Sequence, residues 1–147
     1  KYMANVIPDS FKTDLLKGEF NFDSSGGSTF KLALYTDISG LTATATTAFT
    51  ATNEVGTSGT NYSSGGNALT NNGVAISSNI AFVDFADLTF SSVTLSAVGA
   101  LIYKSGGSNE AVLVLDFGGT KTATNGDFVV QFPTASSSAA IIRLGNA

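Results

Sequence analysis

The sequence contains no cysteine, no histidine and no tryptophan. The absence of cysteine excludes disulfides, thiolate nucleophiles and cysteine-ligated metals, and it leaves the redox compartment undetermined. The absence of histidine removes the usual general base, so catalysis by Ser–His or Cys–His pairs is excluded. No run of residues approaches the roughly 18 apolar residues that a membrane-spanning helix needs. We therefore expect no cofactor, no metal and no membrane span.

Charged residues are also scarce. They make up 12% of the chain, the formal net charge is −4, and the seven lysines and arginines are scattered. A nucleic-acid-binding surface needs clustered positive charge, so we expect no nucleic-acid partner. The hydrophobic fraction of 43% indicates a packed core rather than a disordered chain. The other polar residues are mainly serine, threonine and asparagine, and such a weakly charged surface suits close contact with other protein surfaces.

Residues 1–18 contain the only segment with a helical pattern. Asp9 or Ser10 is expected to cap the helix, and Lys17–Gly18 supplies a cationic last turn and a stop. The segment lacks the apolar core of a signal peptide, so we expect none. Lys1–Tyr2 precede a methionine that looks like a natural start, and the origin of these two residues stays open.

The expected helix carries an apolar stripe. Phe11 and Leu15 are four residues apart on one face, and Leu16 lies beside them. A helix of about two turns is too short to persist alone in water, so this stripe must dock on a partner surface. Either it covers the open end of its own domain, or it reaches a neighbouring subunit. We predict an N-terminal arm over 1–18 and a β-sandwich domain over 19–147, with Phe11, Leu15 and Leu16 as a tentative subunit interface.

After the helix the hydrophobic period changes to two. In residues 29–36, Phe30, Leu32 and Leu34 alternate with less apolar neighbours, which indicates a half-buried strand. Residues 37–73 are rich in Thr, Ser, Gly and Asn and are expected to form a long loop that carries short strands. Further strands are expected at 74–84, 85–91, 93–104, 110–117, 127–132 and 139–144, separated in part by 105–109, 118–126 and 133–138. This pattern predicts an all-β fold, an antiparallel β-sandwich that is jelly-roll-like, with one short N-terminal helix.

Two details of the second half carry specific predictions. Asn125–Gly126 is a strong tight-turn signal, so the loop 118–126 is expected to join 110–117 and 127–132 as antiparallel neighbours. The strand over 93–104 is apolar on both faces in parts and is expected to be covered on two sides. Gly99 inside it suggests a bulge or a close backbone contact.

Three carboxylates are the best candidates for chemistry. Asp84 and Asp87 sit close together, and Asp116 ends an apolar run. Paired acids could serve a glycosidase or bind calcium through oxygen ligands. A structural or turn-capping role is favoured, because Asp84 and Asp87 would face opposite sides of one strand. A Ser–Lys pair at Lys104–Ser105 is weaker still, since adjacent residues at a strand end have no reason to converge.

The aromatic residues divide into two groups. One group falls at alternating strand positions and is expected in the core, with Phe117 and Phe128 near the 118–126 turn; it comprises Phe82, Phe90, Phe117, Phe128 and Phe132. The other group is the more plausible source of exposed contacts, for example to a sugar; it comprises Tyr35, Tyr62 and Tyr103. No spacing among the tyrosines singles out a ligand.

Four segments together show a resemblance to known proteins. They are MANVIPDSFKTDLLKGEFNF, FKLALYT, AFVDFADLTFSSVTLSAVGALIY and VLVLDFGGTKTATNGDFVVQFPTASSSAAIIRL. Their texture and order resemble small β-rich virion structural proteins of tailed bacteriophages, over most of the chain outside 37–73. Such proteins are capsid decoration or cement subunits, or tail and fibre components. They share no active site, so the resemblance transfers no functional residue.

The resemblance implies a non-enzymatic structural subunit located in the virion. A capsid decoration or cement protein is the favoured form, a homo-oligomer that packs against copies of itself, other virion proteins or the capsid lattice. A tail, fibre or filament-forming subunit is the first alternative. A carbohydrate-binding or host-adhesion module is the second, and a glycosidase-like enzyme using the three carboxylates is the third.

Overall fold

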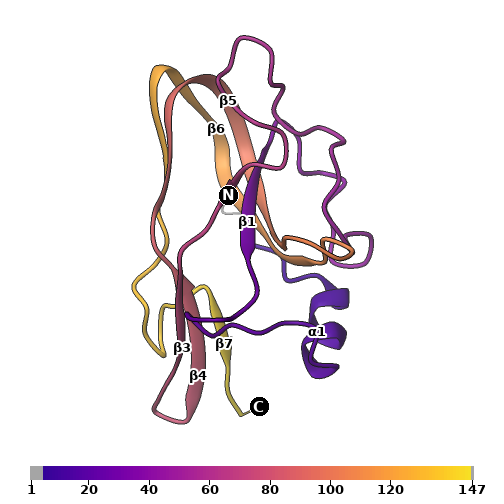
Figure 1. Cartoon of the computed structure of the whole chain (residues 1–147), viewed down its shortest axis with the longest axis vertical. Coiled ribbons are helices and arrows are strands. Elements are labelled where there is room, and N and C mark those ends of the chain that lie inside the picture. The colour runs from indigo at the N-terminus through magenta and orange to yellow at the C-terminus, as the bar shows by residue number, and fades with distance from the viewer. Residues whose placement is uncertain (1–4, 147) are drawn as a thin grey trace.

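Two antiparallel sheets and one short helix make up the fold (Figure 1), which a computed structural model describes for residues 5–146. The elements in chain order are α1 (Asp9–Leu16), β1 (Phe30–Tyr35), β2 (Asn67–Ala68), β3 (Asn71–Ser77), β4 (Ile80–Phe85), β5 (Leu88–Lys104), β6 (Ala111–Val130) and β7 (Ile142–Leu144). The first sheet has the strand order β2-β1-β5-β6 and the second has the order β3-β4-β7. The predicted all-β antiparallel sandwich with one short N-terminal helix is confirmed.

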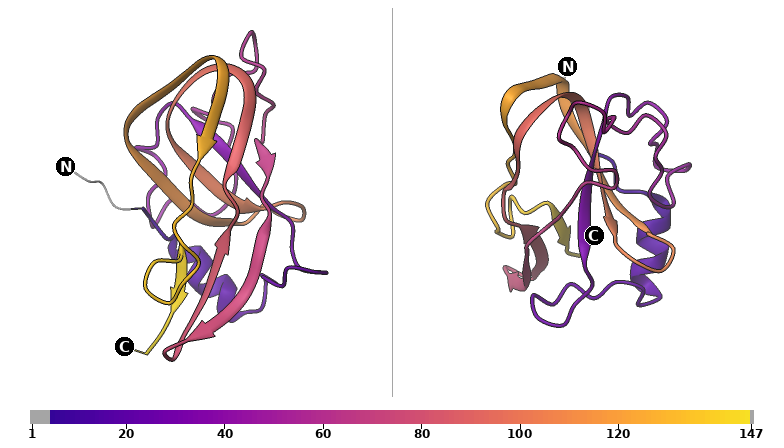
Figure 2. Two further views of the ribbon diagram at one scale, coloured as in Figure 1. Left: turned by 90° about the vertical axis from the view of Figure 1, so that its left-hand side faces the viewer. Right: turned by 45° about the horizontal axis from the view of Figure 1, so that its top comes forward.

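The longest elements are β5 and β6, which pair with each other from Leu88↔Val130 to Tyr103↔Ala111. The strands predicted at 85–91 and 93–104 are therefore largely one strand, β5. The turn predicted at 105–109 is confirmed, since the Asn109 amide donates to the Gly106 carbonyl over 3.1 Å. Figures 1 and 2 show this pair arching away from the second sheet and curving over.

The predicted hairpin at 118–126 is wrong. Residues 111–130 form one strand, β6, and both of its halves pair with β5 instead of with each other. The turn-forming residues Gly118 (φ 72°) and Asn125 (φ 47°) lie at places where the register between the two strands shifts. Positive φ serves a β-bulge as well as a turn, and bulges bend the strand. Phe117 and Phe128 do lie close together, with ring centroids 5.9 Å apart.

Gly99 occupies the kind of position that the sequence predicted. A register shift lies between Ala97 and Gly99, and the extra residues of this bulge belong to β6, between Asp116 and Lys121. A Cβ atom on Gly99 would lie 2.4 Å from the Leu115 carbonyl oxygen and 2.8 Å from a methyl group of Ile38. Of the two predicted alternatives, a bulge or a close backbone contact, the close contact is confirmed, because only glycine leaves room for the neighbouring backbone.

The second sheet contains a hairpin that the sequence analysis missed. The segment predicted as one strand over 74–84 is two strands, β3 and β4, joined by a two-residue turn at Ser78–Asn79. Both turn residues have positive φ, 52° and 63°, as the tight hairpin turns that match strand twist require. The predicted strand at 139–144 shortens to β7.

The main core lies between the two sheets and α1. A chain of phenylalanine rings crosses it with successive centroids 4.7–6.5 Å apart, an arrangement that stabilises cores beyond simple burial. The rings belong to Phe11, Phe20, Phe22, Phe30, Phe85 and Phe132. Phe11 of α1 is thus part of the same core as the sheets. Of the five phenylalanines predicted in the core, Phe90 and Phe128 are buried and the other three are half-buried.

The long loop between β1 and β2 forms a further layer. It covers the outer face of the first sheet, where a second apolar cluster includes Ala33, Tyr35, Leu41 and Leu101. The predicted long loop is confirmed, and its short strand pairings include the bridge Tyr35↔Glu54. Because of this layer β1 is buried on both faces rather than half-buried. The prediction that 93–104 is covered on two sides is confirmed for 99–103 and is wrong for 93–97, where Thr94 and Ser96 are exposed.

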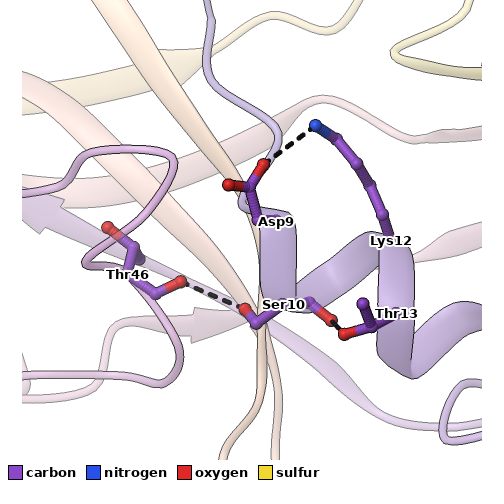
Figure 3. A network of polar contacts seen from close by, with 5 residues as sticks. All are labelled: Asp9, Ser10, Lys12, Thr13 and Thr46. Atoms are coloured by element: carbon purple, nitrogen blue, oxygen red, sulfur yellow. Dashed lines mark hydrogen bonds and ion pairs between the residues drawn. The ribbon is translucent and has the colours of Figure 1, made fainter.

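The start of α1 is held by this loop (Figure 3). The expected cap at Asp9 or Ser10 is wrong, since Pro8 is the N-cap and makes no side-chain cap bond. The Asp9 amide instead donates to the Ala43 carbonyl over 2.9 Å, and the Ser10 hydroxyl donates to the Thr46 carbonyl over 3.1 Å. A tertiary contact therefore replaces the local cap.

Candidate interaction surface

The three tyrosines predicted as exposed contacts are all buried, and that prediction is wrong. Tyr35, Tyr62 and Tyr103 each donate a hydrogen bond with the hydroxyl group, at 2.5–2.8 Å, to Thr50, Glu54 and Gly65 respectively. Buried tyrosine hydroxyls need such partners. The tyrosines therefore fasten the covering loop to the first sheet.

Glu54 is the centre of this network. Its carboxylate accepts hydrogen bonds from the Tyr62 hydroxyl, the Ser64 hydroxyl and the Gly65 amide, at 2.6–2.8 Å. The Tyr62 hydroxyl in turn accepts the Leu34 amide of β1. Burial raises the pKa of Tyr62, and the nearby Glu54 carboxylate raises it further. The network ties the covering loop to β1.

The three candidate carboxylates each bind backbone amides. Asp84 accepts from the Phe85 amide, Asp87 from the Phe132 amide and Asp116 from the Gly118 amide, at 2.7–2.9 Å. This agrees with the favoured structural role. Asp84 is buried, burial raises its pKa, and its Oδ2 atom has no hydrogen-bond partner in the described part of the chain. Within residues 5–146 no three acidic side chains gather closely enough to hold a metal ion.

Lys104, the lysine of the weaker Ser–Lys hypothesis, is also engaged in structural contacts. The Lys104 ammonium group donates to the Glu19 carbonyl over 2.7 Å and lies 3.4 Å from the Glu110 carboxylate. It also lies over the Phe20 ring, 5.4 Å from the centroid. These contacts engage the lysine in holding the chain after α1 against the β5–β6 turn.

The three residues predicted as a subunit interface have different surroundings. Phe11 is only 2% exposed and packs in the main core. Leu15 is partly buried against the same cluster, whereas Leu16 is 89% exposed. The interface assignment stays a prediction, and Leu16 is the residue of the three that a partner could contact without a change in the core.

A second exposed apolar surface lies at the far end of the β3–β4–β7 sheet. We call it the β3 tip; it consists of Val74, Ile76 and Leu144, which are 57%, 73% and 63% exposed. Antiparallel partners point to the same face, so Ile76, Ala81 and Leu144 form one row. The neighbouring row includes Val83, which is buried in the main core. The inner face of this sheet therefore continues beyond the part that the core covers.

The sequence analysis did not single out the β3 tip. A usable signal was present, since no charged residue occurs between Glu54 and Asp84. The alternation of Val74 and Ile76 indicates that both side chains lie on one face of the strand. Periodicity does not indicate which residues of that face the core buries and which it leaves exposed to solvent. Their exposure depends on where the first sheet ends.

A groove runs along the curved strand β6. Its volume is about 940 Å³, within the range that small-molecule sites commonly occupy. Its lining includes the cations Lys121 and Arg143, the carboxylates Asp116 and Asp127, and the aromatic rings Phe117, Phe128 and Phe132. The mixture of charged, amide and aromatic groups suits a polar ligand better than an apolar one.

Comparison of the chain with family models, with curated proteins and with solved structures gave no match. The described part of the chain has one helix, α1, and this helix is far too short to cross a bilayer.

Proposed function

We propose that this chain is a non-enzymatic structural subunit of a phage particle, most favourably a capsid decoration or cement protein that packs against copies of itself or the capsid lattice. The observation that carries the proposal is the β3 tip. Val74, Ile76 and Leu144 form an exposed apolar surface within a stretch that has little charge. Exposed apolar groups that lie together mark protein–protein contact sites.

Two further features support a structural role. The chain has neither histidine nor cysteine, and the carboxylates Asp84, Asp87 and Asp116 already accept backbone hydrogen bonds. The long covering loop is fastened by Tyr35, Tyr62 and Tyr103 instead of being free to close over a substrate. A rigid surface with few charges suits repeated packing in a lattice.

The proposal is tested on the purified full chain by light scattering, negative-stain microscopy and binding to emptied phage heads. A cement protein gives closed oligomers of defined mass that attach to heads. Fibres that form on concentration would favour the tail or filament alternative. A chain that stays monomeric and binds no head, and that mass spectrometry does not find in purified particles, would contradict the structural role.

The groove along β6 favours a carbohydrate-binding or host-adhesion module as a second candidate. Its lining includes the partly buried rings of Phe117 and Phe132, the Lys121 ammonium group and the Asp127 carboxylate, whose Oδ1 atom also accepts the Ser92 amide. Binding of the chain to cell-surface glycans, lost in Asp127→Ala and retained in the exposed variant Asp23→Ala, would support it. The absence of binding across a broad glycan panel would remove this candidate.

A further inference from the structure

The strand β3 is an edge strand with unused hydrogen-bonding groups. It pairs with β4 on one side only, and Figure 2 (left) shows it at the outer side of the sheet. The two-residue turn makes Ser77↔Ile80 a hydrogen-bonded pair, so alternation makes Ile76↔Ala81 and Val74↔Val83 non-hydrogen-bonded pairs. The backbone groups of Val74 and Ile76 therefore point away from β4. In residues 5–146 neither residue has a backbone bond to another element.

The edge also lacks most of the features that normally prevent pairing. Proteins protect edge strands with charges, prolines and bulges. The edge strand β6 has Lys121 and Asp127 and several bulges, and the short edge strand β7 has Arg143. Strand β3 has one bulge, between Asn71 and Val74. After it, the segment 74–77 pairs with β4 in regular register, has no charge and no proline, and exposes Val74 and Ile76 to solvent.

We propose that β3 pairs edge to edge with β3 of a second copy of this chain, about a two-fold axis at Ala75. In this antiparallel register Val74 lies opposite Ile76 of the second copy, and Ala75 lies opposite its own equivalent. The outward N–H and C=O groups of Val74 and Ile76 then bond to those of the second copy. The inference rests on the proposed function in taking the partner to be a copy of the chain.

A second copy fits this edge for two reasons. A two-fold interface brings each group near its own equivalent, and any charge on the edge would then be repelled by itself. The segment between Glu54 and Asp84 has no charge to repel, so self-pairing meets no electrostatic cost there. The register also places the larger Ile76 against the smaller Val74 at both ends, and it joins the two three-stranded sheets into one.

Cross-linking tests the register directly, because the chain has no cysteine of its own. Opposed residues of a non-hydrogen-bonded pair have Cα atoms about 4.5 Å apart, which a disulfide can span. We expect Ala75→Cys to form a disulfide-linked dimer on mild oxidation. The matched control is Ser77→Cys, which lies opposite Gly73 of the second copy and about 13 Å from its own equivalent. At least ten-fold faster cross-linking of Ala75→Cys supports the pairing, and equal rates overturn it.

Substitution tests the energetic role of the side chains. We expect Ile76→Lys to weaken dimerisation at least ten-fold in sedimentation experiments, while the monomer stays folded because Ile76 is exposed. Val129→Lys is the control, since Val129 is also an exposed apolar strand residue, 48% exposed, but lies on β6. A mixture of Val74→Glu and Ile76→Lys chains should dimerise again, since only the proposed register places these two residues opposite each other. A dimer that survives Ile76→Lys overturns the inference.

The outcomes separate this inference from the proposed function. If the chain is found in phage particles but Ala75→Cys cross-links no faster than Ser77→Cys, β3 pairing is overturned and the structural role stands. If β3 pairing holds and the chain is absent from particles, the pairing is supported and the virion role fails. Capture of an unrelated peptide by β3, without self-association, also overturns the inference.

Discussion

The Tyr62 hydroxyl donates a hydrogen bond of 2.8 Å to Oε1 of Glu54. The same hydroxyl accepts a hydrogen bond from the amide of Leu34, the next-to-last residue of β1. One side chain thus satisfies a strand amide and a carboxylate of the loop above it. The covering loop depends on this contact, and the first prediction follows from it.

Tyr62→Phe should lower the free energy of unfolding by about 1–3 kcal/mol, because the buried Leu34 amide loses its acceptor. The ring contact with Phe90 is kept, so the loss reports on the hydroxyl. Urea denaturation measures it, with the exposed loop variant Ser58→Ala as a control of near-zero effect. Equal stability of Tyr62→Phe and the unsubstituted chain would show that the network contributes nothing.

The same tyrosine predicts a loss of stability in alkali. Burial raises the pKa of Tyr62 above its ordinary value of 10.0. Above pH 10 the unfolded chain therefore releases its tyrosine proton before the folded chain does, and stability falls as pH rises. Denaturant midpoints measured from neutral pH into alkali should fall less steeply for Tyr62→Phe. Parallel curves for the two proteins would contradict this expectation.

The buried carboxyl group of Asp84 should make the free energy of unfolding depend on pH in the acid range. Burial raises the pKa of its carboxyl above the ordinary value of 3.8, so between the two pKa values the folded state binds more protons than the unfolded state. The free energy of unfolding therefore falls as pH rises through that window, and the loss remains at neutral pH. Asp84→Asn should flatten this part of the profile in urea titrations. The exposed Asp23→Asn serves as the control, and a profile unchanged by Asp84→Asn would refute the assignment.

The close contact at Gly99 predicts that one added methyl group lowers stability strongly. Gly99→Ala places a Cβ atom 2.4 Å from the Leu115 carbonyl oxygen, which forces the bulge apart. Overpacking of this kind costs about 1–3 kcal/mol and often more where backbone must move. The control is Gly40→Ala, where no atom lies within 4 Å of the added Cβ. Thermal unfolding should separate the two variants by several degrees, and matching melting temperatures would contradict the close contact.

Alanine substitutions of Phe11 and Leu16, in the same helix, should have different effects on the free energy of unfolding. Phe11→Ala should cost about 3–5 kcal/mol, because a buried ring leaves a cavity between Phe20 and Phe22. Leu16→Ala should leave stability almost unchanged, since the side chain is 89% exposed. Denaturation curves measure both. A mild effect of Phe11→Ala would mean that the helix is not part of the core.

Leu16 also offers the remaining test of the predicted helix interface. Leu16→Lys should leave the fold intact and weaken self-association if α1 contacts a neighbouring subunit. Sedimentation of this variant beside Ile76→Lys tells which of the two surfaces carries the assembly. Loss of association in Ile76→Lys alone would leave α1 without a role in the interface.

Much of the local structure could be predicted from the sequence. The alternation of Phe30, Leu32 and Leu34 indicated β1, Gly18 indicated the end of the helix, and Gly99 indicated a close backbone contact. Each of these depends on neighbouring residues, whose spacing determines which side of a helix or strand is apolar. The misreading of Asn125–Gly126 has the same origin, because positive φ is a local property that turns and bulges share.

Which surfaces are covered was decided by tertiary structure alone. Tyr62 is aromatic and Ile76 is apolar, and both have mainly polar neighbours in the sequence. In the structure Tyr62 is buried, whereas Ile76 is exposed. The difference arises from long-range contacts. Strands β5 and β6 pair with each other and the loop folds back onto β1, whereas the β3–β4 hairpin leaves Val74 and Ile76 exposed beside the buried Val83. Periodicity determines which face of a strand is apolar, whereas burial of that face depends on the segments, distant in sequence, that pack against it.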